Sequence, residues 1–121
     1  MPMKNASRIF GQYAEAVAAD YLVKKGFSIL DQNFRYKRFE IDLIVKKDQL
    51  IVFVEVKARK NNLFGHPENF VNQKKMRFIR LAAAHYLRIQ HYNKAVRFDI
   101  ISILGSKNEG IEVVHLEDGF Y

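Results

Sequence analysis

Two apolar runs joined by a short polar turn, residues 39–46 (FEIDLIVK) and 49–58 (QLIVFVEVKA), constrain the fold more than any other part of the chain. Both runs are rich in β-branched residues, and only Lys47 and Asp48 or their immediate neighbours separate them, which predicts a β-hairpin. Four charged side chains interrupt these runs: Glu40, Asp42, Glu55 and Lys57. Charged residues are rarely placed in buried strands unless they are paired, so this pattern needs a physical reason.

The geometry of a hairpin brings these four charges together. Side chains alternate between the two faces of a strand, so the two charges of each run share a face. If the turn is residues 47–48 or residues 48–49, even positions of the first strand oppose odd positions of the second on one face. Asp42 is then directly opposite Glu55 or diagonal to it, with Cβ atoms about 5 Å or about 7 to 8 Å apart.

Two carboxylates at this spacing repel each other unless a positive group lies between them. Lys57 is one such group and a divalent metal ion is the other. Because only oxygen ligands are at hand and the chain has no cysteine, the metal would be Mg²⁺ or Mn²⁺ rather than zinc. A metal beside an ammonium group is suited to phosphodiester hydrolysis. The alternative is a solvated face on which cross-strand ion pairs form.

The remaining segments predict an α/β fold with the order α-β-β-β-α-β-β. The first helix is expected to begin after a cap at Ser7 and to end at Gly26. A second helix is expected from about Glu68 to Gln90, after a polar loop at residues 59–69. Its buried stripe is predicted to be Met76, Ile79, Ala83, Tyr86 and Leu87. The other strands are predicted at residues 27–36, 95–104 and 111–116. The result is a mixed sheet flanked by helices in a single domain, residues 1–121.

The charge balance indicates the kind of partner. The 121 residues carry a formal charge of +7, which favours polyanions, and nucleic acid more than a membrane surface. No stretch is long and apolar enough for a membrane span, and the absence of cysteine is typical of a reducing cytoplasm. Two clusters of basic residues flank the hairpin at the end that carries the carboxylates, and a third opens the second helix; the alternative to phosphate binding is general solubility. The residues that we expect to bind phosphates are Arg35, Lys37, Arg38, Arg59, Lys60, Lys74 and Arg77.

The order Asp42, then Glu55-Val56-Lys57, resembles the split motif of the PD-(D/E)XK nuclease superfamily. Nearly the whole chain resembles the YraN family, which is similar to archaeal Holliday junction resolvases. The matching segments are residues 11–35, 40–44 (EIDLI), 53–59 (FVEVKAR) and 97–101 (RFDII). The resemblance implies a restriction-endonuclease-like sheet, a metal-dependent cut in branched DNA, and a homodimer.

The resemblance also implies roles for further residues. Asp42, Glu55, Glu40 and the Val56 carbonyl would be metal ligands, and Lys57 would position the attacking water. Two other residues would complete the site, namely Glu15 on the first helix and Gln73 near the start of the second. The family pattern has glycine immediately before Glu40, whereas this chain has Phe39. We expect that ring to reshape the floor or edge of the site.

Each of these assignments has a structural alternative. Glu15 would otherwise be an exposed helix residue, and Glu40 would pair with Lys57 or Arg38. Asp99 is expected to pair with Arg97, and the four histidines have no metal-ligand spacing.

The sequence therefore favours a Mg²⁺- or Mn²⁺-dependent endonuclease for structured or branched DNA. The alternative is a nucleic-acid-binding module that keeps the nuclease fold without cutting.

Overall fold

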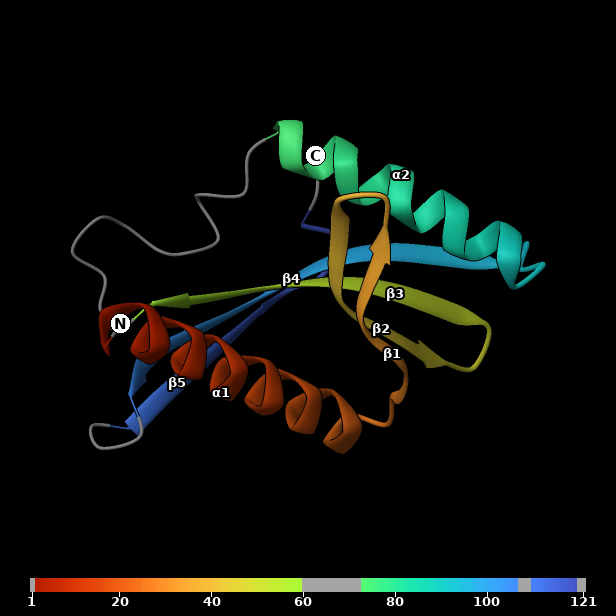
Figure 1. Cartoon of the computed structure of the whole chain (residues 1–121). Coiled ribbons are helices and arrows are strands. Elements are labelled where there is room, and N and C mark those ends of the chain that lie inside the picture. Colours follow the sequence, from red (N-terminus) through yellow and green to blue (C-terminus); the bar gives the residue numbers. More distant parts are fainter. Residues whose placement is uncertain (1, 60–72, 107–109, 120–121) are drawn as a thin grey trace.

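A computed structural model describes residues 2–59, 73–106 and 110–119, and Figure 1 shows its arrangement. Within these residues, two helices and five strands follow one another in the predicted order α-β-β-β-α-β-β. Their bounds are α1 Pro2–Lys24, β1 Ser28–Tyr36, β2 Phe39–Lys47, β3 Leu50–Arg59, α2 Gln73–Ile89, β4 Ala95–Ser106 and β5 Gly110–Leu116. The predicted loop over residues 59–69 and the predicted start of the second helix at Glu68 lie almost wholly outside the described residues.

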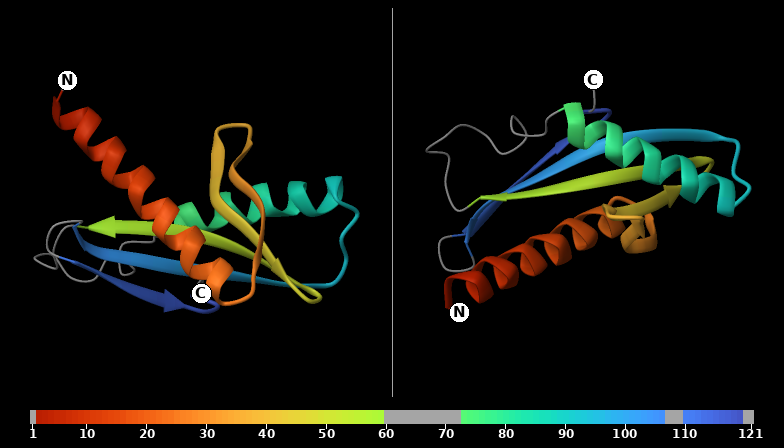
Figure 2. Two further views of the ribbon diagram at one scale, coloured as in Figure 1. Left: turned by 90° about the horizontal axis from the view of Figure 1, so that it is seen from below. Right: turned by 45° about the horizontal axis from the view of Figure 1, so that its top comes forward.

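The five strands form one mixed sheet in the order β1-β2-β3-β4-β5. Strands β3 and β4 are parallel, joined by the crossover that contains α2, and the other neighbours are antiparallel. The two helices lie on opposite faces of this sheet (Figure 1). The β1–β2 hairpin rises out of the plane of the other strands, as the two further views make clear (Figure 2). The predicted α/β sandwich is confirmed.

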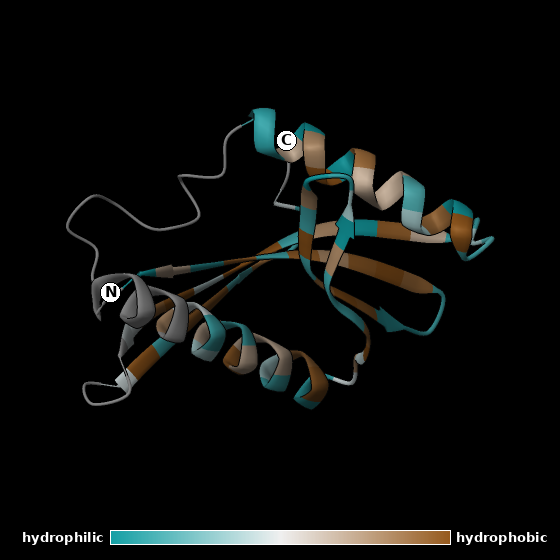
Figure 3. Cartoon of the chain, in the orientation of Figure 1, coloured by the Kyte–Doolittle hydropathy of each residue, from teal (hydrophilic) through white to brown (hydrophobic). Residues whose placement is uncertain are grey.

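Each helix buries a separate core against the sheet. The α1 face is built from small helix residues on aliphatic strand residues, for example Ala14 and Ala18 over Val52 and Val54. On the other face Met76, Ile79, Ala82, Ala83 and Tyr86 of α2 cover strand residues that include Phe53. Brown, apolar positions accordingly follow the strands, and polar positions gather at the tip of the β1–β2 hairpin (Figure 3). Both faces of the central strands are covered, which explains their almost unbroken apolar runs.

The two ends of α1 can be compared with the beginning and the end that the sequence predicts. The predicted stop at Gly26 is confirmed: α1 ends at Lys24, and Gly26 has a φ of 98°, a conformation that suits glycine. The predicted start at Ser7 is wrong, because α1 already begins at Pro2. Proline is well suited to the first helical position and no helix breaker separates it from Ser7, so the helix extends back to it.

The predicted buried stripe of α2 is confirmed, with Leu87 only half-buried and Ala82 added to it.

None of the helices in the described ranges is long and apolar enough to cross a membrane.

Candidate active site

The hairpin of β2 and β3 sets the position of the acidic residues. Its pairs run from Lys47–Leu50 to Leu43–Val54, so the turn is residues 48–49, one of the two predicted alternatives. In this register Asp42 would face Glu55 directly. The ladder stops one position earlier, however, because the β1–β2 hairpin bends away from β3 at this point (Figure 2). The carboxylates therefore lie where the sheet opens.

A side chain replaces the missing backbone pair. The Val56 N–H donates a hydrogen bond to Asp42 Oδ2 at 2.7 Å. Since the N–H and C=O groups of one strand residue point to the same side, the Val56 carbonyl also faces this opening. On the other side of Asp42, Asn33 of β1 has a φ of 55° and lies between the paired stretches of β1 and β2. The backbone is irregular on both sides of Asp42, as is common at functional sites.

Asp42 is strongly perturbed. Burial, the negative charge of Glu55 and a hydrogen bond to the Glu55 carboxyl group together raise the pKa of Asp42 to about 8, although the hydrogen bond from Val56 opposes this. Glu15 adds a smaller repulsion. Ionisation of Asp42 is therefore opposed by burial and by the second carboxyl group beside it.

Two lysines flank Glu55, whose side chain is only 2 % exposed. Lys57 Nζ lies 3.5 Å from Glu55 Oε2, and Lys75 of α2 forms an ion pair with the same oxygen. Oε2 nevertheless has no hydrogen bond of good geometry within the described part of the chain. Burial lowers the pKa of Lys57, and Lys75 adds to this effect against the pull of Glu55. Burial opposes ionisation of Lys75 as well, but the charge of Glu55, hydrogen bonds with Glu55 and Lys57 and the charge of Asp42 together raise the pKa of Lys75.

Two further carboxylates lie at the periphery. Burial raises the pKa of Glu15, and so do the charges of Glu40 and Glu55, whereas a hydrogen bond with Asn33 lowers it. Glu15 is thus near the site, not on a remote face of α1. Glu40 forms an ion pair with Arg35 at 3.1 Å. Its expected partners Lys57 and Arg38 are replaced by this cross-strand neighbour, because Arg35 is directly opposite Glu40 in the β1–β2 ladder.

The acidic residues open into a pocket of about 270 Å³ between the start of β2 and α2. Its polar side is formed by Glu40, Asp42, Glu55 and Lys75, and its apolar side by Phe39, Phe78 and Ile79, with Arg38 at the rim. The Phe39 ring stacks on Phe78 with centroids 4.4 Å apart. The expectation that Phe39 reshapes the edge of the site is consistent with this position.

Gln73 and Lys75 show where sequence reasoning was incomplete. Gln73 is exposed at the first residue of α2 and does not line the pocket. Lys75, two residues later, reaches Glu55 instead. Lys75 lies in a basic run, and its residue type does not distinguish it from its neighbours. Only helical spacing could have done so: Lys75 lies four residues before the buried Ile79, on the edge of the face that α2 turns to the sheet.

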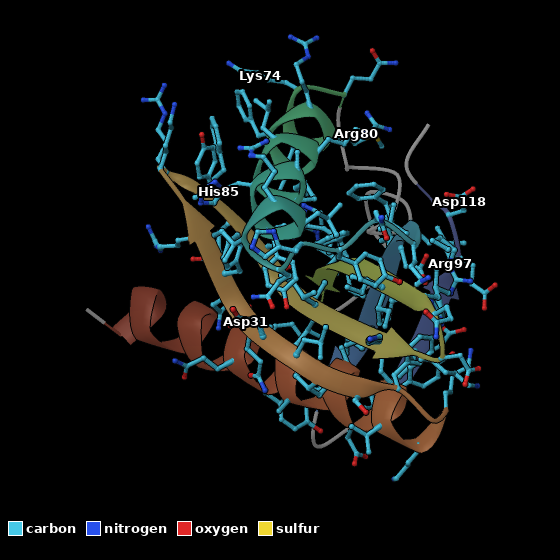
Figure 4. All side chains as sticks on the ribbon, turned by 90° about the vertical axis from the view of Figure 1, so that its right-hand side faces the viewer. Asp31, Lys74, Arg80, His85, Arg97 and Asp118 are labelled. Atoms are coloured by element: carbon cyan, nitrogen blue, oxygen red, sulfur yellow. The ribbon has the colours of Figure 1, made fainter. Side chains whose placement is uncertain are left out.

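Of the predicted phosphate-binding residues that the structure describes, Arg38 lines the pocket and the others lie on the hairpin, at the end of β3 and on α2. Arg35, Lys37 and Arg38 are exposed at the tip of the β1–β2 hairpin, and Arg59 is exposed at the end of β3. Lys74 and Arg77 are exposed on α2, where Lys74 points away from the sheet (Figure 4). Lys60 lies outside the described residues.

The donor set fits a hard divalent cation. In the ranges 2–59, 73–106 and 110–119, no three His, Cys, Asp or Glu side chains gather as a complete protein cage for a metal. Mg²⁺ does not need one, because it commonly takes one or two carboxylates and keeps several waters. Two adjacent carboxyl groups, one with a raised pKa and one with an oxygen that lacks a hydrogen bond of good geometry, fit the ligand set of such a cation.

A second buried acid lies elsewhere. Asp99 on β4 is paired with Arg97 as expected, at 2.8 and 2.9 Å, and also with His115 and the backbone N–H of Asp118. Burial tends to raise its pKa, but the hydrogen bonds from His115, Arg97 and Asp118 hold the pKa of Asp99 below its usual value. Figure 4 places Arg97 and Asp118 together, well apart from Lys74 and His85 of α2. This cluster is structural.

The fold is an α/β domain with two carboxyl groups where its sheet opens, and comparison with known proteins gives the family. The model of the Uncharacterised protein family UPF0102 matches residues 14–103. A UPF0102 protein of Clostridium perfringens is 44 % identical over 84 % of both chains. One of Geotalea daltonii is 42 % identical over 97 % of this chain and 93 % of its own, and one of Flavobacterium psychrophilum is 36 % identical over 92 % of both.

The chain belongs to the UPF0102 family, which is the YraN family. The resemblance expected from its motifs is thereby confirmed at the level of the family.

Proposed function

We propose that this protein is a metal-dependent endonuclease that hydrolyses phosphodiester bonds in structured or branched DNA. The observation that carries the proposal is the position of the Asp42 and Glu55 carboxyl groups, which line one pocket while Lys57 and Lys75 contact Glu55. A structural ion-pair network would neutralise its acids, whereas this one leaves Asp42 with a pKa of about 8. Strongly perturbed groups that converge in a cleft are typical of active sites.

Each residue has a role that follows from its surroundings. Asp42, Glu55 and the Val56 carbonyl would hold Mg²⁺ or Mn²⁺, with Glu15 and Glu40 around them. Bound there, the ion would polarise a phosphoryl oxygen and lower the pKa of a water molecule. Lys57 is the residue suited to orient that water, because its lowered pKa makes the neutral amine easier to form. Lys75 and Arg38 would bind the phosphate that enters the pocket.

Hydrolysis in such a site is chemically balanced. The oxygen of a water molecule forms a bond to phosphorus, and the bond from phosphorus to one sugar oxygen breaks. The attacking water loses a proton, which a group at the site accepts. The departing sugar oxygen gains a proton. Basic residues at the hairpin tip, Arg35 and Lys37 among them, would hold the flanking phosphates, and these contacts carry no sequence information.

The test is cleavage of labelled junction, flap, single-stranded and duplex DNAs, and of one matched RNA, in Mg²⁺ or Mn²⁺. We expect the parent protein to cut at least one branched DNA, and Asp42→Asn, Glu55→Gln and Lys57→Ala to abolish cutting. Glu112→Gln, at an exposed position on β5, is the matched control and should cut like the parent. Undiminished cutting by Asp42→Asn would refute the catalytic assignment. Binding by the parent without cleavage of any substrate would establish the non-cleaving module instead.

A further inference from the structure

The apolar side of the pocket has no part in the chemistry proposed above. Phe39 and Phe78 lie almost parallel, with an angle of 12° between their rings, and both are only half-buried. Together with Ile79 they face the carboxylates across the pocket. Aromatic rings kept partly open beside a polar site are a common way to bind a flat ligand.

Positive charge lies next to this aromatic wall. Lys74 Nζ is 5.9 Å from the centre of the Phe78 ring, and Arg38 is at the rim. Lys75 is on the polar side, and Lys57 lies behind it against Glu55 at 3.5 Å. The site therefore offers a stacking surface for a flat ring and, within a few ångströms, cations for an anion. A flat amine would also suit the carboxylates, but four nearby cations oppose a positively charged ligand.

A nucleotide has this combination of a flat ring and an adjacent anion. The volume of about 270 Å³ is just below the roughly 300 Å³ at which ligand pockets usually begin, so it suits one base and not a base pair. In a continuous duplex the bases are stacked and paired, and none of them can reach such a wall without being extruded. An unpaired base has no such cost.

We propose that the Phe39–Phe78 wall binds a single unpaired base, which places the neighbouring phosphate against the Asp42–Glu55 pair. The substrate class is then a strand with an unpaired nucleotide beside the bond that is cut, as at a bulge, flap or junction. This inference rests on the proposed function for the cut itself, but the binding step it predicts is independent of cleavage.

The test measures binding in the Asp42→Asn background, in which strands stay intact. The probes are a short duplex with one central unpaired 2-aminopurine and the same duplex fully paired. We expect the unpaired probe to bind more tightly and its fluorescence to be quenched by stacking. Phe39→Leu should weaken binding of the unpaired probe by about 5- to 150-fold, the range expected when one base can no longer stack, and leave the paired probe within about twofold.

Two further variants separate stacking from folding. Phe39→Trp keeps a flat ring and should retain the preference for the unpaired probe. Phe98→Leu is the matched control, because Phe98 is also half-buried and stacked, on Phe53 at 5.3 Å, but lies on β4 away from the pocket. Melting temperatures of all variants show that each is folded.

An equal loss of affinity for both probes, or no loss with Phe39→Leu, would overturn the base-binding pocket. Cleavage by the parent of paired and unpaired DNA alike, unaffected by Phe39→Leu, would overturn it too while the nuclease assignment stands. A preference that depends on Phe39 in a protein that cuts nothing would support the pocket and refute the nuclease.

Discussion

Asp42 is a half-buried acid and Asp99 a fully buried acid on one sheet, and their surroundings are opposite. Both oxygens of Asp99 accept two hydrogen bonds each, and its pKa is lowered. Asp42 has one backbone hydrogen bond, faces Glu55 and has a pKa of about 8. Burial alone therefore does not identify a functional acid. The distinguishing property is whether the folded chain supplies enough donors to stabilise the ionised carboxylate: Asp99 has them and Asp42 does not.

The reason lies in the partners that each acid meets. Asp99 is held by a guanidinium, an imidazole and a backbone N–H from two strands and a turn, which together tie β4 to β5. His115 extends the cluster to α1, because its Nδ1 lies 3.3 Å from the Tyr21 hydroxyl. Such a fully satisfied network stabilises one arrangement of the elements.

The largest effect is expected at Asp99. Asp99→Asn removes the charge that compensates Arg97, whose side chain is only 23 % exposed, and breaks a buried network. Loss of one partner of a buried pair costs about 3 to 5 kcal/mol. Urea unfolding at neutral pH should show this loss, whereas Asp20→Asn, at an exposed ion pair with Lys24, should change stability by only about a few tenths of a kcal/mol. A mild Asp99→Asn variant would remove the contrast between the two acids.

Removing the ionisable group of Asp42 should raise the stability of the folded protein, whereas removing that of Asp99 lowers it. Its pKa is raised from 3.8 to about 8, so between these pH values the folded state binds more protons than the unfolded state. The free energy of unfolding of the metal-free protein should therefore fall as pH rises through this window and level off above it. The full shift corresponds to about 6 kcal/mol, and with Lys57 and Lys75 nearby we expect about 2 kcal/mol to be measurable.

Urea unfolding in EDTA at several pH values measures this slope. Asp42→Asn cannot ionise, so it should lack most of the decline and be at least as stable as the parent near pH 8. Asp20→Asn should keep the decline of the parent. If Asp42→Asn is less stable than the parent at every pH measured, Asp42 is a structural acid like Asp99.

Metal ions should act on one acid and not on the other. Mg²⁺ at about ten times its dissociation constant stabilises a one-site protein by about 1.4 kcal/mol. For a domain of this length that is a rise in Tm of about 4 to 6 °C. Thermal melts in EDTA, Mg²⁺ and Mn²⁺ should show the rise in the parent and in Glu112→Gln, and not in Asp42→Asn or Glu55→Gln. The same rise in all four proteins would exclude a metal site at this pair.

The smallest effect concerns the exposed charges around the pocket. Neutralising Arg35, Lys37 and Arg38 together should lower the slope of log affinity for duplex DNA against log salt by up to about 0.9 for each phosphate that the protein no longer binds. A control that neutralises Lys24, Arg88 and Lys94, which are exposed away from the pocket, should leave the slope unchanged. Equal changes in both triple variants would place the DNA-binding surface elsewhere.

Much of this site could be predicted from local pattern. Strand alternation puts Asp42 and Glu55 on one face whichever turn is used, and the observed turn at residues 48–49 is one of the two foreseen. The pairing of Asp99 with Arg97 followed from their two-residue spacing on one strand. The beginning of α1 was missed because a favourable cap residue, Ser7, carries no information about whether the helix continues behind it.

The order of elements, the faces they bury and the identity of the paired acids could all be read from the amino-acid sequence, since they depend on periodicities of two and 3.6 residues. Three features emerged only from the folded arrangement: β2 leaves β3 at Asp42, Lys75 and not Gln73 reaches Glu55, and Phe39 lies on Phe78. These contacts join segments far apart in the chain. They depend on where the hairpin bends and how α2 is rotated against the sheet, and no local pattern encodes either.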